Sequence, residues 1–270
     1  MGCSFKFRLG DIYINDAFGT AHRAHSSMVG VNLPVRAAGF LLAKELENFA
    51  KIMEKPERPL LVVMGGAKVK DKIPVIMKML DLVDEMIIGG GMTFTFQKVH
   101  DKMEIGDSIF DTDGAAIIED ILKKAKEKNI KMHFPVDFRC GDKYDKDANV
   151  KIFKASEGIP KGWRGLDNGP ATDARFAEVV SKARTILWNG PQGVFEFPAF
   201  RESSLRMLEN LMEATEKGAS TIAGGGETVS LIQSVRDAAE KLSHVSTGGG
   251  ASLELLEGRE LPGIAALSDA

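Results

Sequence analysis

The chain has 270 residues, of which 44% are hydrophobic and 27% are charged, and its formal net charge is −3. This length suits one large domain with an additional fragment, or two small domains. A near-neutral surface of mixed charge argues against nucleic acid or an anionic membrane as a partner, and no apolar run is long enough to cross a bilayer. The two cysteines, Cys3 and Cys140, are interpreted as free thiols of a reducing compartment, which predicts a cytoplasmic protein.

The N-terminal part of the chain differs from the rest. Residues 1–36 are too few to bury a core alone, and the strand-like run at residues 11–15 is expected to need neighbours that this chain does not contain. Residues 37–55 are predicted to form one amphipathic helix, which Pro56 and Pro59 close. Because this helix lies between the two parts of the chain, it is a candidate interdomain helix. Its predicted apolar face consists of Phe40, Leu41, Leu46, Phe49, Ala50 and Met53.

Short apolar runs that end in glycine recur along the remainder of the chain. Such runs suit a parallel sheet covered on both faces, and amphipathic helical patterns lie between them. This alternation predicts a doubly wound α/β domain over residues 56–270, with a mostly parallel sheet in a Rossmann-like three-layer α/β/α arrangement. The predicted strands are 60–64, 86–88, 185–188, 221–223 and 245–247, and the predicted helices are 71–83, 114–128, 175–183, 200–217 and 227–241.

The glycine clusters all follow predicted strands. In an open α/β sheet the ligand crevice lies beyond the carboxyl ends of the strands. We therefore expect the glycines to line one edge of the sheet, where a ligand binds.

The first cluster, Gly65–Lys72, joins a strand to a helix that carries Pro74 in its first turn. Free N–H groups at a helix start favour anions, and Lys68 and Lys72 add positive charge. If this turn is already helical, the two lysines point the same way. The spacing is not that of a P-loop. A phosphate site is predicted; the alternative is a tight turn with solvated lysines.

Three further clusters suggest the rest of an anion site. Gly224–Thr228 places Glu227 beside a second cradle, where a carboxylate suits Mg²⁺, although it could also simply stabilise the helix start. Ser246–Ser252 could form a nest for a transferring phosphoryl group, or a flexible turn. Trp188–Glu196 could wall a nucleoside pocket with Glu196 accepting from ribose hydroxyls, or could serve core packing.

The fifth motif, Asn15–Ser27, carries His22, Arg23 and His25 in a polar loop. It suggests a small anionic substrate, or a solvated loop. The spacing of the histidines, with no carboxylate partner, disfavours zinc. Taken together, the five motifs offer anion cradles, lysines and one carboxylate but almost no covalent nucleophile, a composition that favours phosphoryl transfer by positioning and charge stabilisation.

These motifs, in this order, resemble phosphoglycerate kinases from about Gly10 to the C-terminus. The resemblance implies two α/β lobes, of which the first binds 3-phosphoglycerate and the second binds Mg-nucleotide. It implies reversible phosphoryl transfer between 1,3-bisphosphoglycerate and ADP, giving 3-phosphoglycerate and ATP. The segments that carry it are Asn15–Ser26, Gly65–Lys68, Trp188–Pro191 with Gly193–Glu196, and Ser246–Glu254.

The resemblance also implies roles for single residues. Lys72 would contact nucleotide phosphates, Lys68 would stabilise the transferring phosphoryl group, and Glu227 would hold Mg²⁺. His22 and Arg23 would belong to the side that binds the acid substrate. The positions implied around the nucleoside are Gly66, Ala67, Gly90, Gly165, Leu166, Asn189, Pro191, Val194 and Glu196, and those implied at phosphates are Gly225, Gly226, Thr228, Gly248 and Gly249, with Gly225 and Gly249 catalytic.

Two departures from the family pattern affect the expected activity. The family usually has Asp where Glu227 stands, and Mg²⁺ tolerates altered geometry poorly. Most of the first lobe's basic patch is absent, and Met1–Leu9 break the pattern as a truncation or fusion junction would. Each lost donor to developing charge can cost about 2.7–4 kcal/mol, so nucleotide binding is expected to survive and turnover to be very weak or absent.

Three hypotheses therefore stay open. The chain could have the family activity, perhaps with a partner chain supplying the other lobe, or it could be a nucleotide-binding module without catalysis. A Rossmann-type dehydrogenase is disfavoured because no Gly-x-Gly-x-x-Gly motif follows a strand with an acidic residue about 20 positions on. A monomer is expected, with self-association through the exposed interdomain helix as the alternative.

Overall fold

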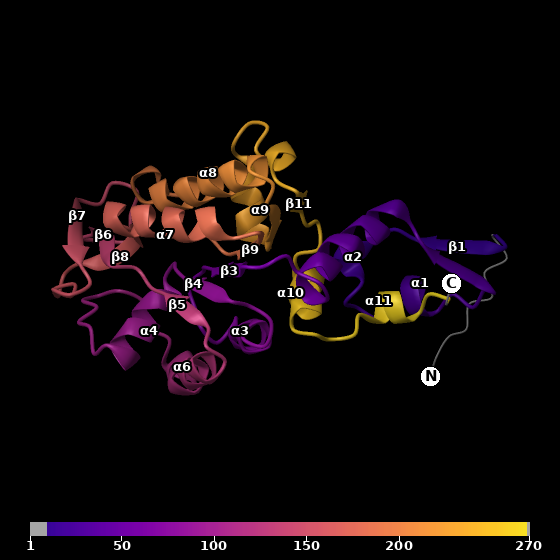
Figure 1. Ribbon diagram of the computed structural model, residues 1–270, viewed down its shortest axis with the longest axis horizontal. Helices are drawn as coiled ribbons and strands as arrows, with labels where there is room; N and C mark the ends of the chain where they lie inside the picture. The colour runs from indigo at the N-terminus through magenta and orange to yellow at the C-terminus, as the bar shows by residue number, and fades with distance from the viewer. Residues whose placement is uncertain (1–9, 269–270) are drawn as a thin grey trace.

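The computed structural model describes residues 10–268, so Cys3 and the segment Met1–Leu9 lie outside the described part. Figure 1 shows an elongated molecule with a large α/β domain at one side, and with the first and last described segments of the chain together at the other. None of the described helices is long and apolar enough to cross a membrane.

A parallel six-stranded sheet forms the centre of the α/β domain and confirms the predicted fold class. Its strand order is β11-β10-β9-β3-β4-β5, and every neighbouring pair is parallel. The order reverses between β3 and β9, and at such a switch a ligand crevice is expected. The strands are β3 (Leu60–Met64), β4 (Glu85–Ile88), β5 (Lys131–His133), β9 (Thr185–Asn189), β10 (Ser220–Gly224) and β11 (His244–Val245).

Helices cover both faces of this sheet, as Figure 1 shows. Side chains alternate along a strand, so Leu60 and Val62 join one core cluster and Leu61 and Val63 the other. The first cluster packs against α3 (Ile73–Met79), α6 (Ile118–Glu127) and α10 (Gly250–Leu256), and the second against α7 (Pro170–Lys182), α8 (Glu202–Glu216) and α9 (Gly226–Gln233).

Several elements differ from the sequence-based expectation. Helix α4 (Met92–His100) was missed because the side chains from Met92 to Gln97 are all buried, which leaves no amphipathic period to detect. The predicted helix 114–128 is two helices, α5 (Thr112–Ala115) and α6, and the predicted helix 227–241 is α9 followed by the short 3-10 helix η3 (Ala239–Lys241). An antiparallel sheet of order β7-β6-β8 was also missed; it consists of β6 (Asp137–Gly141), β7 (Val150–Lys154) and β8 (Arg164–Asn168).

The N-terminal strand finds its partner within the chain, contrary to expectation. Strand β1 (Ile12–Asn15) pairs in parallel with β2 (Val35–Ala38), which occupies residues that were assigned in part to the helix. Helix α2 therefore spans Phe40–Met53 rather than 37–55. Its predicted apolar face was wrong at its N-terminal end, because the Phe40 residue is 95% exposed and Leu41 is 39% exposed. The predicted members Phe49, Leu46 and Met53 do pack into or against the core. The residues that α2 buries are Leu42, Glu45, Asn48, Phe49 and Ile52.

The C-terminal end of the chain completes the core of the N-terminal segment. Phe18, in the 3-10 helix η1 (Phe18–Thr20), stacks on Phe49 with ring centroids 6.0 Å apart. Gly263 in α11 (Pro262–Ala265) donates a backbone hydrogen bond of 2.8 Å to Ala21. The short α1 (Ser26–Val29) packs against α11. Residues 10–36 thus acquire a core through tertiary contacts, which a count of their own residues could not reveal.

Candidate functional site

The glycine loops converge where four neighbouring strands end, as the sequence predicted. Gly65 donates a backbone hydrogen bond of 2.9 Å to Asn189, and Gly66 donates one of 3.2 Å to Pro191. A Cβ added to Gly65 would lie 2.1 Å from the Pro191 carbonyl oxygen, and one on Gly90 would lie 2.6 Å from the Gly66 nitrogen. These glycines are needed because the strand ends cross one another closely.

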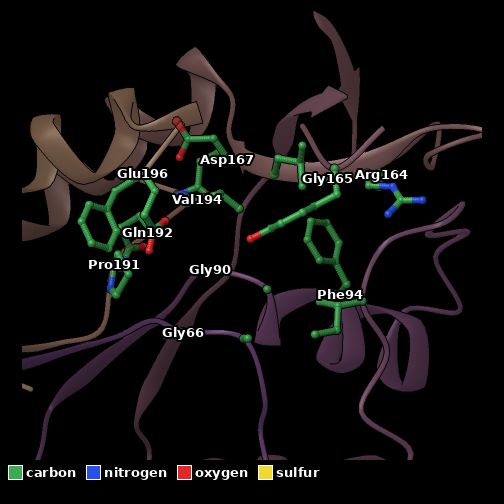
Figure 2. Close-up of a pocket in the computed structure, with 18 of the residues that line it drawn as sticks. Gly66, Gly90, Phe94, Arg164, Gly165, Asp167, Pro191, Gln192, Val194 and Glu196 are labelled. Atoms are coloured by element: carbon green, nitrogen blue, oxygen red, sulfur yellow. The ribbon is translucent and has the colours of Figure 1, made fainter. Parts of the chain in front are cut away.

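A cavity of about 380 Å³ opens beside these loops (Figure 2). Gly66 and Gly90 lie along one edge, Pro191, Gln192 and Glu196 at one end, and Phe94, Gly165 and Arg164 at the opposite end. Of the positions predicted for the nucleotide, the cavity brings together Gly66, Ala67, Gly90, Gly165, Leu166, Pro191, Val194, Glu196 and Glu227.

Five other predicted positions lie next to the cavity without lining it. Asn189 is fully buried, and its Nδ2 atom donates a hydrogen bond of 3.1 Å to the Gly224 carbonyl oxygen. The hydroxyl of Thr228 accepts from the Gly190 N–H at 2.7 Å, so this side chain supports the loop. Gly225 has φ of +94° at the start of α9, whereas a Cβ on Gly226 would meet nothing within 4 Å. Lys72 is the fifth.

Lys72 is turned inward and donates to the Asn189 side-chain oxygen. Burial lowers the pKa of the Lys72 amine, and the negative charges of Glu227 and Asp71 oppose that effect. Lys68, four residues earlier, is exposed. Helix α3 begins only at Ile73, so the two lysines do not share a helical turn, which was the condition for them to point the same way.

Glu227 is one of the carboxylates that line the cavity. It lies exposed in the first turn of α9, and no cluster of three or more metal-ligating side chains occurs within residues 10–268. Mg²⁺ is commonly held by one or two carboxylates together with substrate phosphates and water. A single exposed carboxylate beside the open backbone at Gly226 fits that mode of binding.

The histidine loop and the last glycine cluster pack directly against one another. The His22 ring lies so close to Gly250 that an added Cβ would be 3.0 Å from its Nε2 atom, and a Cβ on Gly248 would be 2.3 Å from the Phe18 ring. His22 Nδ1 is buried and has no hydrogen-bond partner among the described residues. Arg23 is exposed, and a Cβ on Gly249 would meet open space. The structure therefore joins two segments that are more than 200 residues apart.

A buried carboxyl group was missed by the sequence reasoning. Asp167, at the end of β8, accepts from Arg139 Nη1 at 3.0 Å and from the Ser203 N–H at 3.1 Å, while its other oxygen has no partner within the described residues. Burial raises the pKa of Asp167 to about 7 although these contacts oppose it, and burial raises the pKa of neighbouring Asp173 to about 6. The sequence signal that could have identified Asp167 is its position directly after Gly165 and Leu166, which were both predicted to lie at the nucleoside.

Other cavity residues also escaped prediction because they come from unpredicted elements. Phe94 lies on α4, Arg164 begins β8, and Tyr144 lies on the loop between β6 and β7. The aromatic Tyr144 packs against Phe197 with centroids 5.1 Å apart. The rings of Phe94 and Tyr144, together with the side chains of Leu166 and Val194, give the cavity apolar walls.

Comparison with known proteins gives a consistent answer. A family model described as phosphoglycerate kinase matches residues 6–259. The chain is 60% identical over 262 residues to a phosphoglycerate kinase of Sterkiella nova and 59% identical over 261 residues to one of Tetrahymena thermophila, in each case covering 97% of this chain and 62% of the relative. The structure resembles phosphoglycerate kinase from Coxiella burnetii with a TM-score of 0.90 at 37% identity, covering 96% of this chain and 65% of that one. The chain thus spans less than two thirds of the length of these relatives.

Proposed function

This chain belongs to the phosphoglycerate kinase family, and we propose that it supplies the Mg-nucleotide side of a phosphotransferase. The proposed reaction is the reversible transfer of a phosphoryl group between 1,3-bisphosphoglycerate and ADP, which gives 3-phosphoglycerate and ATP in glycolysis. The observation that carries the proposal is the cavity at the sheet's carboxyl edge, which has apolar walls for a base and the Glu227 carboxylate in its lining.

The proposed chemistry relies on charge and position. Lys68 and Lys72 stabilise phosphate charge, Glu227 holds Mg²⁺, and the backbone at Gly225, Gly226 and Gly249 approaches phosphoryl oxygens. Bound Mg²⁺ neutralises charge on the phosphates. Because phosphoryl transfer needs little covalent chemistry from the protein, the scarcity of nucleophiles around the cavity is consistent with this role.

On the acid-substrate side we assign His22 and Arg23. Exposed Arg23 can meet an anionic ligand, and His22 packs against the Gly248–Gly250 loop. We divide the chain into residues 1–36 as part of the substrate lobe, 37–55 as the interdomain segment containing α2, and 56–270 as the nucleotide domain. The placement of α11 against residues 10–36 adds the C-terminal end to the first of these parts.

A nucleotide-binding module with impaired turnover is the second candidate. The basic side chains assigned above to the acid-substrate side are only those of His22 and Arg23, and this small number favours the second candidate. In either case we propose a cytoplasmic protein that is monomeric in dilute solution and binds neither nucleic acid nor membrane.

The test is a calorimetric titration of the full chain with Mg-ADP, accompanied by a coupled turnover assay with Mg-ATP and 3-phosphoglycerate. The Lys72→Met variant removes the half-buried charge, and Lys161→Met removes an exposed charge outside the cavity. We expect Lys72→Met to weaken Mg-ADP binding at least tenfold and Lys161→Met to leave it unchanged. Turnover that Lys72→Met abolishes supports the kinase; binding without turnover supports the module. Failure of the folded chain to bind Mg-ADP contradicts both.

A further inference from the structure

We propose that Arg164 determines base specificity in the cavity, by donating hydrogen bonds to the O6 and N7 acceptors of a 6-oxopurine nucleoside diphosphate such as GDP or IDP. This inference rests on the proposed function, which assigns a nucleotide to this cavity. It adds a residue that reads the base.

The first observation is a set of unmatched polar atoms. Arg164 Nε is buried and has no hydrogen-bond partner within residues 10–268. The same holds for single atoms of Asp167, Asn168 and Gln192, and all four residues line the cavity. Buried polar groups are nearly always hydrogen-bonded in folded proteins, so these groups are expected to be completed by a ligand or by water.

The second observation is the place of Arg164 in the cavity. It lies with Phe94 and Gly165 at the end opposite Glu196 (Figure 2). Two hydrogen bonds hold the backbone around it. The Gly165 N–H donates to Ser108 Oγ at 2.9 Å, and the Asp107 N–H donates to the Trp163 carbonyl oxygen at 2.8 Å. If Glu196 accepts from the ribose, the purine N9 points toward Glu196. The far edge of the base, which carries the C6 substituent, then faces Arg164.

The chemistry of that edge discriminates between purines. Guanine and hypoxanthine present O6 and N7 as adjacent acceptors, which the two parallel N–H groups of a guanidinium match. Adenine instead presents an N6 amine, a donor, next to its N7 acceptor. The Asp107 side chain, which also lines the cavity, can accept from the N1–H of a 6-oxopurine. A single bond from Arg164 to an adenine ring nitrogen is the competing arrangement.

The experiment measures the Kd values of Mg-GDP, Mg-IDP and Mg-ADP for the full chain by calorimetry. Arg164→Met removes the charge, Arg164→Lys keeps the charge but loses the planar fork, and Lys161→Met removes an exposed charge nearby. We expect both Arg164 variants to raise the Kd values of Mg-GDP and Mg-IDP about tenfold or more, which corresponds to a loss of about 1.4 kcal/mol of binding free energy. The loss for GDP and IDP should exceed the loss for ADP at least about fivefold, and circular dichroism spectra that match the wild type should show that the variants are folded. Lys161→Met should change none of the three.

Three outcomes overturn the inference. Equal weakening of all three nucleotides means that Arg164 acts only through its charge. A larger loss for ADP means that it reads adenine. Unchanged affinities for all three nucleotides mean that Arg164 does not contact the base and that water is the hydrogen-bond partner of its Nε atom. Each of these leaves the proposed function standing, because ADP still binds the wild-type chain, whereas a wild-type chain that binds no nucleotide overturns the proposed function itself.

Discussion

Glu45 and His244 form a buried pair that joins helix α2 to the sheet. Glu45 Oε2 lies 2.7 Å from His244 Nε2, and Glu45 Oε1 accepts from both the backbone N–H and the hydroxyl of Thr247 at 2.7 Å. The Glu45 side chain has no solvent exposure. Thr247 immediately precedes the Gly248–Gly250 loop, so one carboxylate connects helix α2 to a predicted phosphate loop.

The first prediction concerns the stability that this carboxylate provides. Burial acts to raise the pKa of Glu45, but the hydrogen bonds from His244 and Thr247 outweigh it and lower the pKa below 4.5. A lowered carboxyl pKa contributes stability that is present above the unfolded value and is lost as pH falls through the folded value. We expect Glu45→Gln to lower the free energy of unfolding by about 1.5–3 kcal/mol at pH 7, and we expect this difference to shrink as pH falls through the lowered pKa of Glu45.

Urea unfolding between pH 3 and 8 measures this difference. Glu47→Gln, on the exposed side of the same helix, is the matched control and should change little. A Glu45→Gln deficit that stays constant through the acid range would show that the carboxylate charge is not what stabilises the junction.

The second prediction concerns the buried carboxyl of Asp167. Because its folded pKa of about 7 lies above the ordinary value of 3.8, the native state binds more protons than the unfolded state between these values. Wild-type stability therefore falls as pH rises through this window. In Asp167→Asn this contribution is absent, so the Tm of the variant minus that of the wild type should be more positive at pH 8 than at pH 5.

Thermal unfolding at several pH values gives both curves. Asp101→Asn provides the control, because the Asp101 side chain is 51% exposed. Parallel Tm curves for wild type and Asp167→Asn would mean that Asp167 remains ionised throughout, held by Arg139.

The third prediction separates two glycines of the site. Gly65→Ala places a methyl group 2.1 Å from the Pro191 carbonyl oxygen, a backbone atom that cannot move freely, so the fold should lose about 1–3 kcal/mol or more. Gly226→Ala meets no atom within 4 Å, so its stability should be close to that of the wild type. If phosphates approach the backbone at Gly226, the same change should weaken Mg-ADP binding. Denaturant unfolding measures the stability of both variants, and calorimetry measures their affinity for Mg-ADP. A Gly226→Ala variant that is destabilised but binds Mg-ADP normally would contradict the prediction.

The fourth prediction concerns the exposed end of α2. The Phe40 residue is 95% exposed, and Ile12 and Ile14 on β1 are more than 60% exposed. An apolar surface of this kind favours association with another surface. We expect a weak, concentration-dependent self-association that Phe40→Ser reduces, measured by sedimentation velocity over a hundredfold range of concentration. Identical, concentration-independent sedimentation of both proteins would show that this surface does not drive association.

Much of the fold could be predicted because its signals are local. Apolar runs such as Leu60–Met64 that end in glycine mark buried parallel strands, and their carboxyl ends necessarily share an edge. Most predicted nucleotide positions therefore line a single cavity. Helix α4 and the antiparallel sheet around Asp167 gave no such signal. The first six residues of α4 are all buried and show no amphipathic period, and short edge strands such as β7 resemble loops.

The sequence by itself determined the α/β class, the glycine edge and the resemblance to the family, because each depends on residue type and order along the chain. The tertiary structure alone decided the contacts between distant segments. Only the fold could show that β2 pairs with β1, that α11 completes the core around Ala21, and that Glu45 meets His244 almost 200 residues away. The physical reason is that burial and hydrogen bonding depend on which surfaces meet in space, and local sequence patterns do not record that.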